Sequence, residues 1–176
     1  GITKRKIKSD NLNDVIYLNS LFPHLLAKYC LQKKVRVVHF STDCVFDGKI
    51  GNYDENSETN STDFYGKTKS LGEIKYDNSI TIRSSFIGHE LFDKTELFEW
   101  VLSNEGMTIK GFKNCLYSGV STNFMTQITR KIITDFPKLN GVYQLATDNP
   151  ISKFDLISII NRIYKLNINI IPDYSF

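Results

Sequence analysis

The stretch VRVVHFSTD, residues 35–43, decides the fold class of this chain. Its valine-rich apolar run predicts a buried strand over 35–41, and the hydroxyls of Ser41 and Thr42 fall at the end of that strand. An amphipathic segment over 64–76 follows and predicts a helix. A buried strand followed by an amphipathic helix is typical of parallel α/β sheets, which bind ligands at the carboxyl ends of their strands.

The predicted helix opens on a second informative stretch, YGKTK, residues 65–69. Lys69 follows Tyr65 by four residues, so both side chains lie on one helix face, one turn apart. A phenol with a pKa of about 10 is a poor proton donor at neutral pH, and a nearby ammonium lowers that pKa. Together with the hydroxyl of Thr42, these side chains predict hydride transfer to or from a carbonyl. In that reaction Tyr65 donates the proton, Thr42 holds the substrate oxygen, and Lys69 also binds a nicotinamide ribose.

The Tyr-x-x-x-Lys spacing by itself is weak evidence. The chain holds nine tyrosines, so about one such spacing is expected by chance, and a second copy runs from Tyr29 to Lys33. That copy lies late in another predicted helix, with no hydroxyl at a strand end before it. Packing and solvation explain it, and the preceding strand selects Tyr65.

Several motifs together carry a family resemblance. STDCVFDG at 41–48, YDE at 53–55, YGKTKSLGE at 65–73 and IRSSFIG at 82–88 resemble the extended short-chain dehydrogenase/reductases. They are most similar to the dTDP-4-dehydrorhamnose reductase branch of sugar-nucleotide enzymes. The resemblance continues more faintly through residues 141–146 and 151–156, so it covers most of the chain, although its specific part is confined to 41–88.

The alternation of strands and helices predicts a three-layer α/β core with a parallel sheet. The resemblance implies a Rossmann-like fold with a smaller C-terminal lobe that binds substrate. Residues 1–88 would form the C-terminal part of the Rossmann-like domain. Residues 89–176 would belong partly to the lobe and, through 142–146, partly to the sheet.

The resemblance also implies a function. It is the NADPH- or NADH-dependent reduction of a nucleotide-linked 4-keto-6-deoxy sugar, in the supply of deoxysugars for surface polysaccharide. Related folds catalyse epimerisation or dehydration of sugar nucleotides, and one relative is a non-catalytic regulatory subunit of methionine adenosyltransferase. Both alternatives stay open at this stage, although the complete set of Thr42, Tyr65 and Lys69 argues against the regulatory one.

The resemblance assigns candidate roles residue by residue. The catalytic candidates are Thr42, Tyr65 and Lys69. The candidates for binding NADP or NAD are Ser41, Tyr65, Lys69, Ser84 and Ser85. The candidates for binding the nucleotide sugar are Thr42, Asp43, Val45, Phe46 and Phe86. Simpler interpretations remain beside these: a turn cap for Asp43, ordinary turn serines at 84–85, and core packing for Val45 and Phe46.

The chain departs from the family pattern in three places. Cys44 stands where the branch usually has tyrosine, and Phe86 where tryptophan is common, which leaves the preferred hexose open. No glycine-rich dinucleotide motif occurs, and the chain opens on Gly1 without a methionine. We therefore expect a fragment that lacks the N-terminal strands of the sheet, with a short natural variant as the alternative. Such a fragment would bind dinucleotide weakly, show little turnover and expose a strand edge that favours a homodimer.

Composition excludes several other functions. The net charge is +3 from 22 basic and 19 acidic side chains, and the basic run over 4–8 is short, so no nucleic-acid surface is expected. The three cysteines, Cys30, Cys44 and Cys115, lack metal-ligand spacing, so a reducing compartment and no metal are expected. Neither a membrane-length apolar stretch nor a signal peptide is visible, which predicts a cytoplasmic enzyme.

The remaining pattern predicts the other elements. A helix over 11–32 would bury Val15, Leu18, Phe22, Leu25 and Leu26 and be kinked at Pro23. On that helix Asn19 would either brace the site or be a buried polar residue satisfied by backbone. The polar segment 42–63 reads as a functional loop. Further strands are predicted at 79–83, 108–111, 115–117, 142–146 and 168–171, and further helices at 97–102, 123–134 and 153–164.

Overall fold

A computed structural model describes residues 1–175 of the chain. The chain forms two compact units, which we call unit 1 (Gly1–Ser84 with Thr126–Leu145) and unit 2 (Ser85–Met125 with Ala146–Phe176). The later segment of unit 1 carries a strand of its sheet, at the place where residues 142–146 are predicted to return to the sheet.

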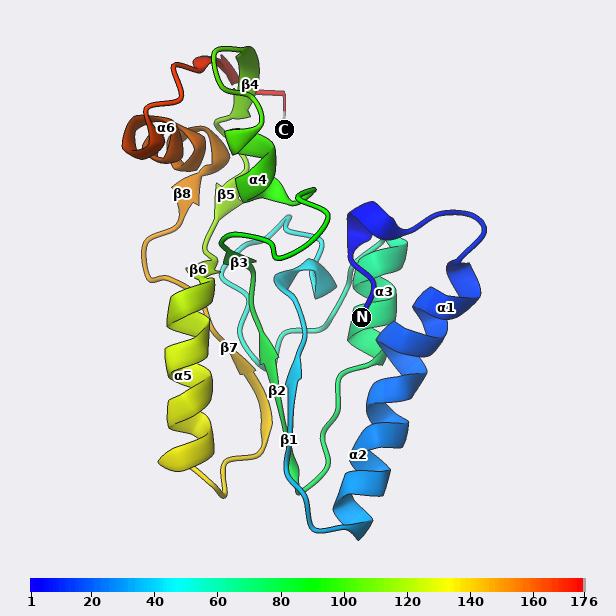
Figure 1. Ribbon diagram of the computed structural model, residues 1–176. Coiled ribbons are helices and arrows are strands. Elements are labelled where there is room, and N and C mark those ends of the chain that lie inside the picture. The colour runs from blue at the N-terminus through cyan, green and yellow to red at the C-terminus, as the bar shows by residue number, and fades with distance from the viewer. Residues whose placement is uncertain (176) are drawn as a thin grey trace. The chain divides into compact units, whose positions relative to one another are not determined.

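The sheet of unit 1 has three parallel strands. They are β1 (Val37–Phe40), β2 (Ser79–Arg83) and β7 (Gly141–Gln144), in the order β1-β2-β7. Within this sheet β1 is an outer strand, and all three strands run upward in Figure 1. The α/β class with a parallel sheet, predicted from the sequence, is confirmed.

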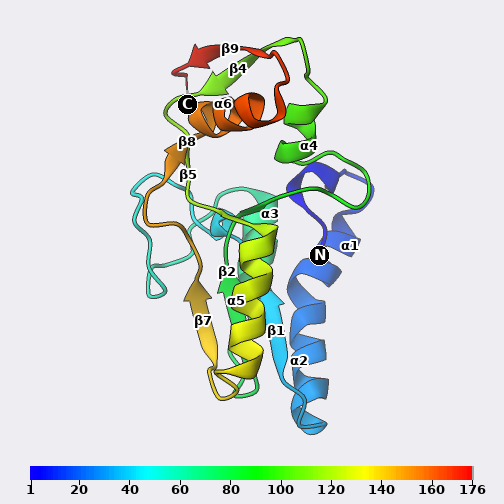
Figure 2. The ribbon, with the colours of Figure 1, turned by 60° about the vertical axis from the view of Figure 1, so that its left-hand side comes forward.

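Helices lie on both faces of that sheet. Helices α2 (Phe22–Gln32) and α3 (Phe64–Leu71) lie on one side, and α5 (Thr122–Thr134) lies on the other, as Figures 1 and 2 show from two directions. Arg36, just before β1, donates hydrogen bonds to the backbone oxygens of Ile132 and Leu139, which ties the α5 side to the strand. Unit 1 is therefore a three-layer structure.

The helical stretch before β1 is interrupted earlier than predicted. It consists of α1 (Leu12–Ile16), a π-helical turn η2 (Tyr17–Leu21) and α2. Pro23 is the second residue of α2 and follows the π-helical turn closely; its ring supplies no N–H to the continuous helical stretch. The irregularity thus falls in the turn before the proline.

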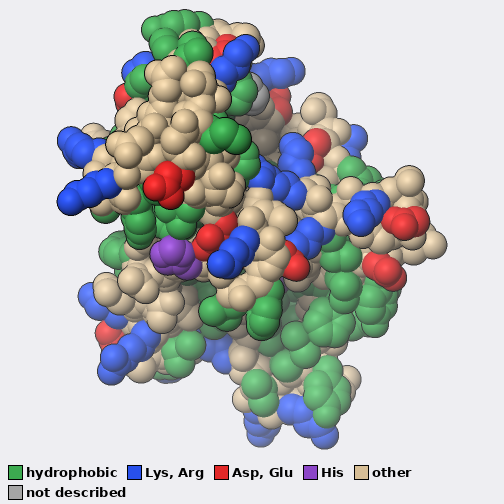
Figure 3. Space-filling view, turned by 45° about the horizontal axis from the view of Figure 1, so that its top comes forward, with side chains coloured by type: hydrophobic (Ala, Val, Ile, Leu, Met, Phe, Trp, Pro, Cys, Tyr) green, Lys and Arg blue, Asp and Glu red, His purple; other side chains and the backbone are tan. Residues whose placement is uncertain are grey.

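The predicted core stripe of this stretch is largely wrong. Val15 is buried, but Leu18, Phe22, Leu25 and Leu26 are all exposed. Small or polar side chains form the buried stripe instead, at intervals of four residues: Val15, Asn19, Pro23 and Ala27. At Asn19 the π-helical turn lies close to the end of α3, since a Cβ atom added at Gly72 would lie only 1.9 Å from the Asn19 backbone oxygen. Hydrophobic side chains consequently gather on the surface over these helices (Figure 3).

Two segments of unit 1 also differ from the predictions. Helix α3 ends at Leu71 rather than at 76, because the backbone turns away after Gly72 and Ile74 forms hydrogen bonds with the Thr81 hydroxyl instead. The 42–63 segment contains one short helix, η3 (Asp43–Val45), and is otherwise irregular. A further short helix, η1 (Lys4–Lys6), precedes α1.

Unit 2 is built from short strands and two helices. The strands pair as β3 (Phe86–Ile87) with β6 (Val120–Ser121), β4 (Thr108–Phe112) with β9 (Asn169–Asp173), and β5 (Leu116–Tyr117) with β8 (Ile151–Ser152). The first two pairs are parallel and the third is antiparallel. Helices α4 (Leu97–Leu102) and α6 (Lys153–Tyr164) match the predictions. The core is aliphatic and consists of Val101, Ile109, Ile157, Ile160, Leu166 and Ile168.

No helix within residues 1–175 is long and apolar enough to cross a membrane.

Candidate active site

The three catalytic candidates all lie in unit 1. Thr42 is the second residue after the end of β1, and Tyr65 and Lys69 lie on α3. The carboxylate of Asp63 caps α3 by accepting a hydrogen bond from the Gly66 N–H at 3.0 Å. A Cβ atom at Gly66 would lie 2.1 Å from the Cys44 backbone oxygen, so only glycine lets the first turn of α3 pack this closely against η3. This contact holds the helix that carries Tyr65 beside the segment that follows β1.

Lys69 is a buried cation. Lys69 is only 7% exposed, and its Nζ donates a hydrogen bond to the Phe40 backbone oxygen at 2.8 Å. Burial lowers the pKa of Lys69, while the negative charge of Glu73 acts in the opposite direction. An ammonium has three N–H donors, and the hydrogen bond to Phe40 uses one of them. Among residues 1–175 the other two donors have no partner, so they are placed to meet oxygen atoms of a ligand.

Tyr65 precedes Lys69 by one turn of α3 and is half-buried. Its backbone oxygen accepts a hydrogen bond from the Thr68 hydroxyl at 3.0 Å. The structure therefore places the phenol and the ammonium on one helix face, as the spacing predicts.

The hydroxyl of Thr42 takes part in a turn. It accepts a hydrogen bond from the Cys44 N–H and donates one to the Asp43 carboxylate, each at 3.2 Å. Thr42 is the N-cap of η3, and it is buried. Its role in holding a substrate oxygen stays a prediction, because that role requires the hydroxyl to exchange its bond with Asp43 for one with the substrate.

Two of the predicted cofactor residues have hydroxyls that bond inside unit 1. Ser41 donates to the Glu73 carboxylate at 2.8 Å, and Ser84 donates to the Leu145 backbone oxygen at 2.7 Å. Both residues are buried. Ser85 belongs to unit 2, where its backbone oxygen accepts a hydrogen bond from the Val120 N–H at 2.9 Å.

Among the predicted substrate residues, Val45 and Phe46 lie in the interior. Val45 is fully buried, and the Phe46 ring stacks on Tyr53 with ring centroids 4.3 Å apart. The guanidinium of Arg83 lies over the Phe46 ring at 5.1 Å from its centroid. Phe86 lies in β3 of unit 2 and is 52% exposed. All the other substrate candidates lie in unit 1, together with Tyr65, Lys69, Ser41 and Ser84.

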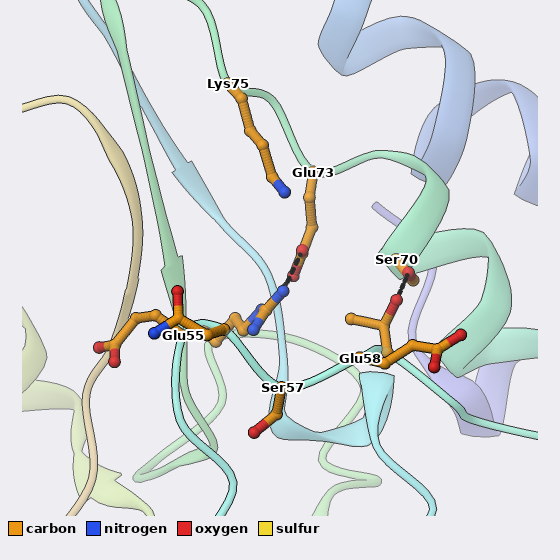
Figure 4. A pocket seen from close by; sticks show the side chains of 9 residues that line it. Glu55, Ser57, Glu58, Ser70, Glu73 and Lys75 are labelled. Carbon is orange, nitrogen blue, oxygen red and sulfur yellow. Dashed lines mark hydrogen bonds and ion pairs between the residues drawn. The ribbon is translucent and has the colours of Figure 1, made fainter.

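The sequence reasoning missed a buried ion pair beside these residues. Arg83 donates two hydrogen bonds of 2.8 Å to the Glu73 carboxylate, and the two side chains are 3% and 4% exposed. A polar cavity of about 540 Å³ lies next to the pair, and Figure 4 shows the labelled Glu73 at it. Its lining is Glu55, Asn56, Ser57, Glu58, Thr59, Ser70, Glu73, Lys75 and Arg83. Little in the sequence indicated this ion pair: Glu73 stands four residues after Lys69, and Arg83 stands at the end of a predicted strand.

Asn19 is held by the backbone. Its amide oxygen accepts a hydrogen bond from the Ile2 N–H at 2.7 Å, and its amide nitrogen donates to the Ile2 oxygen at 2.9 Å. The same nitrogen lies 3.4 Å from the hydroxyl of Thr68, the neighbour of Lys69. Of the two interpretations left open for Asn19, the backbone-satisfied one describes these contacts directly.

The structure holds no candidate metal site of three or more His, Cys, Asp or Glu side chains within residues 1–175. Cys30, Cys44 and Cys115 are free thiols, and burial is the main cause that raises the pKa of Cys44.

Comparison with known proteins gives consistent matches. The family model described as the RmlD substrate binding domain matches residues 9–90. A dTDP-4-dehydrorhamnose reductase of Aggregatibacter actinomycetemcomitans is 30% identical over 141 residues, which cover 74% of this chain and 47% of that protein. A probable low-salt glycan biosynthesis reductase of Haloferax volcanii is 32% identical over 94 residues, 49% of this chain and 31% of that protein. The chain thus spans less than half the length of these relatives.

Solved structures share the fold. The dTDP-4-dehydrorhamnose reductase of Bacillus anthracis, in complex with NADP, superposes with a TM-score of 0.82 at 18% identity over 99% of this chain and 64% of that one. A hypothetical dTDP-4-dehydrorhamnose reductase of Sulfolobus tokodaii gives a TM-score of 0.77 at 26% identity over 92% of this chain and 57% of that one. The Rossmann-like fold and the motifs at 41–88 agree with these matches. Over most of its length the chain is therefore similar in sequence to the dTDP-4-dehydrorhamnose reductases, and it shares the Rossmann-like fold of their solved structures.

Proposed function

We propose that the protein reduces the keto group of a nucleotide-linked 4-keto-6-deoxy sugar with NADPH or NADH, and so supplies a deoxysugar for surface polysaccharide. The observation that supports this most directly is the buried ammonium of Lys69. It lies one turn after Tyr65, bonded to the last residue of β1, and it keeps two N–H donors for a ligand.

Each side chain has a distinct task in this proposal. A bound nicotinamide supplies a hydride to the carbonyl carbon. Tyr65 donates its proton to the carbonyl oxygen, and the positive charge of Lys69 stabilises the phenolate that remains. Thr42 orients the same oxygen with its hydroxyl. Because the three groups come from one helix and one strand end, they are held by rigid elements before the substrate binds.

The residues present fit one end of a dinucleotide. The two spare donors of Lys69 suit the hydroxyls of a nicotinamide ribose. Phosphate groups, in contrast, are bound chiefly by glycine-rich turns at helix N-termini, and the 176 residues contain no such motif. We therefore expect these residues alone to bind NADPH weakly. The NADP and NAD found in solved relatives support a nicotinamide cofactor without deciding between the two.

The test is cofactor oxidation by the complete gene product that carries this sequence. With dTDP-4-keto-6-deoxyglucose as substrate, we expect one NADPH oxidised per sugar reduced. Tyr65→Phe removes the proton donor and should lower kcat by about 100-fold or more. Tyr29→Phe is the matched control, since Tyr29 also stands four residues before a lysine but follows no strand end. A Tyr65 variant as active as the Tyr29 variant would contradict the assignment.

The same assay separates the alternatives. The fold is shared with a dTDP-glucose 4,6-dehydratase of Bacillus anthracis, at a TM-score of 0.70 and 15% identity. It is also shared with a UDP-glucuronic acid 4-epimerase of Bacillus cereus, at a TM-score of 0.71 and 18% identity. An epimerase or dehydratase would convert its sugar without net oxidation of NADPH. Dinucleotide binding with no turnover of any sugar nucleotide would favour a regulatory subunit.

A further inference from the structure

Lys69 and Glu73, four residues apart in the chain, both form hydrogen bonds at the end of β1. Lys69 donates to the Phe40 backbone oxygen, and Glu73 accepts from the Ser41 hydroxyl, each at 2.8 Å. Phe40 is the last residue of β1, and Thr42 follows Ser41 directly. The position of Thr42 relative to α3 therefore depends on both contacts.

Glu73 is itself fixed from a third element. Its Oε1 accepts from Ser41 and from Nε of Arg83, and its Oε2 accepts from Nη2 of Arg83, all at 2.8 Å. Arg83 ends β2, the strand next to β1 in the sheet. In Figure 4 the dashed line joins the Glu73 carboxylate to this guanidinium. One carboxylate thus links the ends of two neighbouring strands to the segment that follows α3.

We propose that Glu73 is a positioning residue: it fixes the strand end that carries Thr42 and supplies the countercharge of Lys69, while Arg83 fixes Glu73. The inference rests on the proposed function for the importance of Thr42 and Lys69. The contacts that carry it stand independently of any reaction.

The charge of Lys69 depends on its surroundings. Its own burial opposes the charged form, and the amino group of Gly1 near it has the same sign of charge, whereas burial lowers the pKa of His39 on β1 to about 4 and so keeps it neutral near pH 7. Glu73 is the negatively charged group that acts on it, and Arg83 lies behind Glu73. A buried ammonium that lost its countercharge would release its proton more readily, and a neutral Lys69 would no longer stabilise the phenolate of Tyr65.

If the Glu73–Arg83 pair only supports the fold, we expect other results than if Glu73 acts on Lys69. Glu73→Gln and Arg83→Gln both break the same pair and leave one buried partner alone. If the pair only supports the fold, the two variants should affect Lys69 alike. If Glu73 sets the charge of Lys69, the two variants should shift its pKa in opposite directions, because they remove charges of opposite sign.

The experiment is an NMR titration of lysine side chains in the 176-residue chain, with Lys69→Arg used to assign the Lys69 resonance. We expect Glu73→Gln to lower the pKa of Lys69 by about one unit or more and Arg83→Gln to raise it. Shifts in the same direction, or no shift in either variant, would overturn the proposal.

A double variant keeps the test decisive if either single variant fails to fold. Glu73→Gln with Arg83→Gln leaves no unpaired charge, and it should still lower the pKa of Lys69, by less than Glu73→Gln alone. An unchanged Lys69 pKa in the folded double variant would count against the proposal.

Turnover provides an independent readout in the complete gene product. Because activity requires charged Lys69, the rate falls as pH rises through the Lys69 pKa. Glu73→Gln should therefore move the alkaline limb of the pH profile to lower pH, and Arg83→Gln to higher pH. If the protein proves not to be a reductase, this readout is lost but the NMR shifts remain, so failure of the function and failure of the inference are distinguishable.

Discussion

The two units of the molecule differ in the polar side chains that they bury, although both have a hydrophobic interior. Unit 1 buries many polar side chains, namely Asn19, Ser20, Ser41, Thr42, Ser61, Thr68, Lys69, Glu73, Ser79, Thr81, Arg83 and Ser84. Among the described residues of unit 2, only Glu99 and Ser152 are buried polar side chains, and its core is a cluster of aliphatic residues. Burial of polar groups thus coincides with the candidate chemistry, whereas unit 2 is held by apolar packing.

This contrast changes what each unit depends on. A buried polar group is tolerated only with a well-placed partner, so unit 1 depends on hydrogen-bond geometry and on close backbone approach. An aliphatic cluster depends mainly on filled volume. Variants that disturb geometry should therefore act on unit 1, and variants that remove volume should act on unit 2.

The largest effect is expected at the contact of α3 with the π-helical turn. Gly72→Ala places a Cβ 1.9 Å from the Asn19 backbone oxygen, so the two backbones must separate. We expect a loss of about 4 kcal/mol or more in the free energy of unfolding, measured by chemical denaturation.

Gly51→Ala is the matched control for Gly72→Ala. No atom lies within 4 Å of the added Cβ, so only the strain of its φ of +74° remains, about 1 kcal/mol. Equal losses at both glycines would show that the close approach is not what makes Gly72 sensitive.

The second prediction concerns apolar volume in unit 2. Ile157 is 3% exposed in the aliphatic core, and Ile157→Ala should cost about 3 kcal/mol. Trp100, the one tryptophan of the chain, packs against this cluster, so its fluorescence reports the loss. Ile163→Ala, in the same helix but 64% exposed, should change the free energy of unfolding by less than about 0.5 kcal/mol.

The third prediction is a pH dependence in unit 1. Burial lowers the pKa of His39 from 6.5 to about 4, with the charge of Lys69 as the next cause. The unfolded chain then binds the proton more tightly, so the free energy of unfolding should fall as pH decreases from about 6.5 to about 4, by at most about 3 kcal/mol. Denaturation at a series of pH values measures the slope, and His39→Gln should reduce it. If His39→Gln left the slope unchanged, the pH dependence of the free energy of unfolding would come from other groups.

The smallest predicted effect is at the start of α6. The Ser152 hydroxyl accepts a hydrogen bond from the Asp155 N–H at 3.0 Å and caps the helix. Ser152→Ala should destabilise unit 2 by about 1 kcal/mol, again followed by Trp100 fluorescence. Ser158→Ala, within the same helix, removes a hydroxyl that donates to the Phe154 backbone oxygen, and it should cost a few tenths of that amount. A larger loss of stability for Ser158→Ala than for Ser152→Ala would show that the Ser152 cap is not what stabilises the start of α6.

The sequence predicted those features that depend on residues close together in the chain. Apolar runs and helical spacing predicted β2, α4 and α6 at their observed bounds, and they placed Tyr65 and Lys69 on one helix face. Motifs at 41–88 were specific enough to indicate the family. The two-residue strands β3, β6 and β8 were missed, whereas β5, which is equally short, was predicted at 115–117; a strand of two residues is too short for alternation to show it consistently.

Other features depended on partners far along the chain. Leu18, Phe22, Leu25 and Leu26 share helical spacing, but the buried positions are Val15, Asn19, Pro23 and Ala27 instead. The hydroxyl of Ser84 bonds to Leu145, 61 residues away, and Ser41 bonds to Glu73, 32 residues away. Periodicity tells which residues share a face but not what that face meets. By itself, therefore, the sequence determined the fold class, the similarity to the reductases and the order of the catalytic candidates along the chain. Only the tertiary structure decided the buried Glu73–Arg83 pair, the π-helical turn and the partners of each hydroxyl, because these depend on contacts between segments distant in the chain.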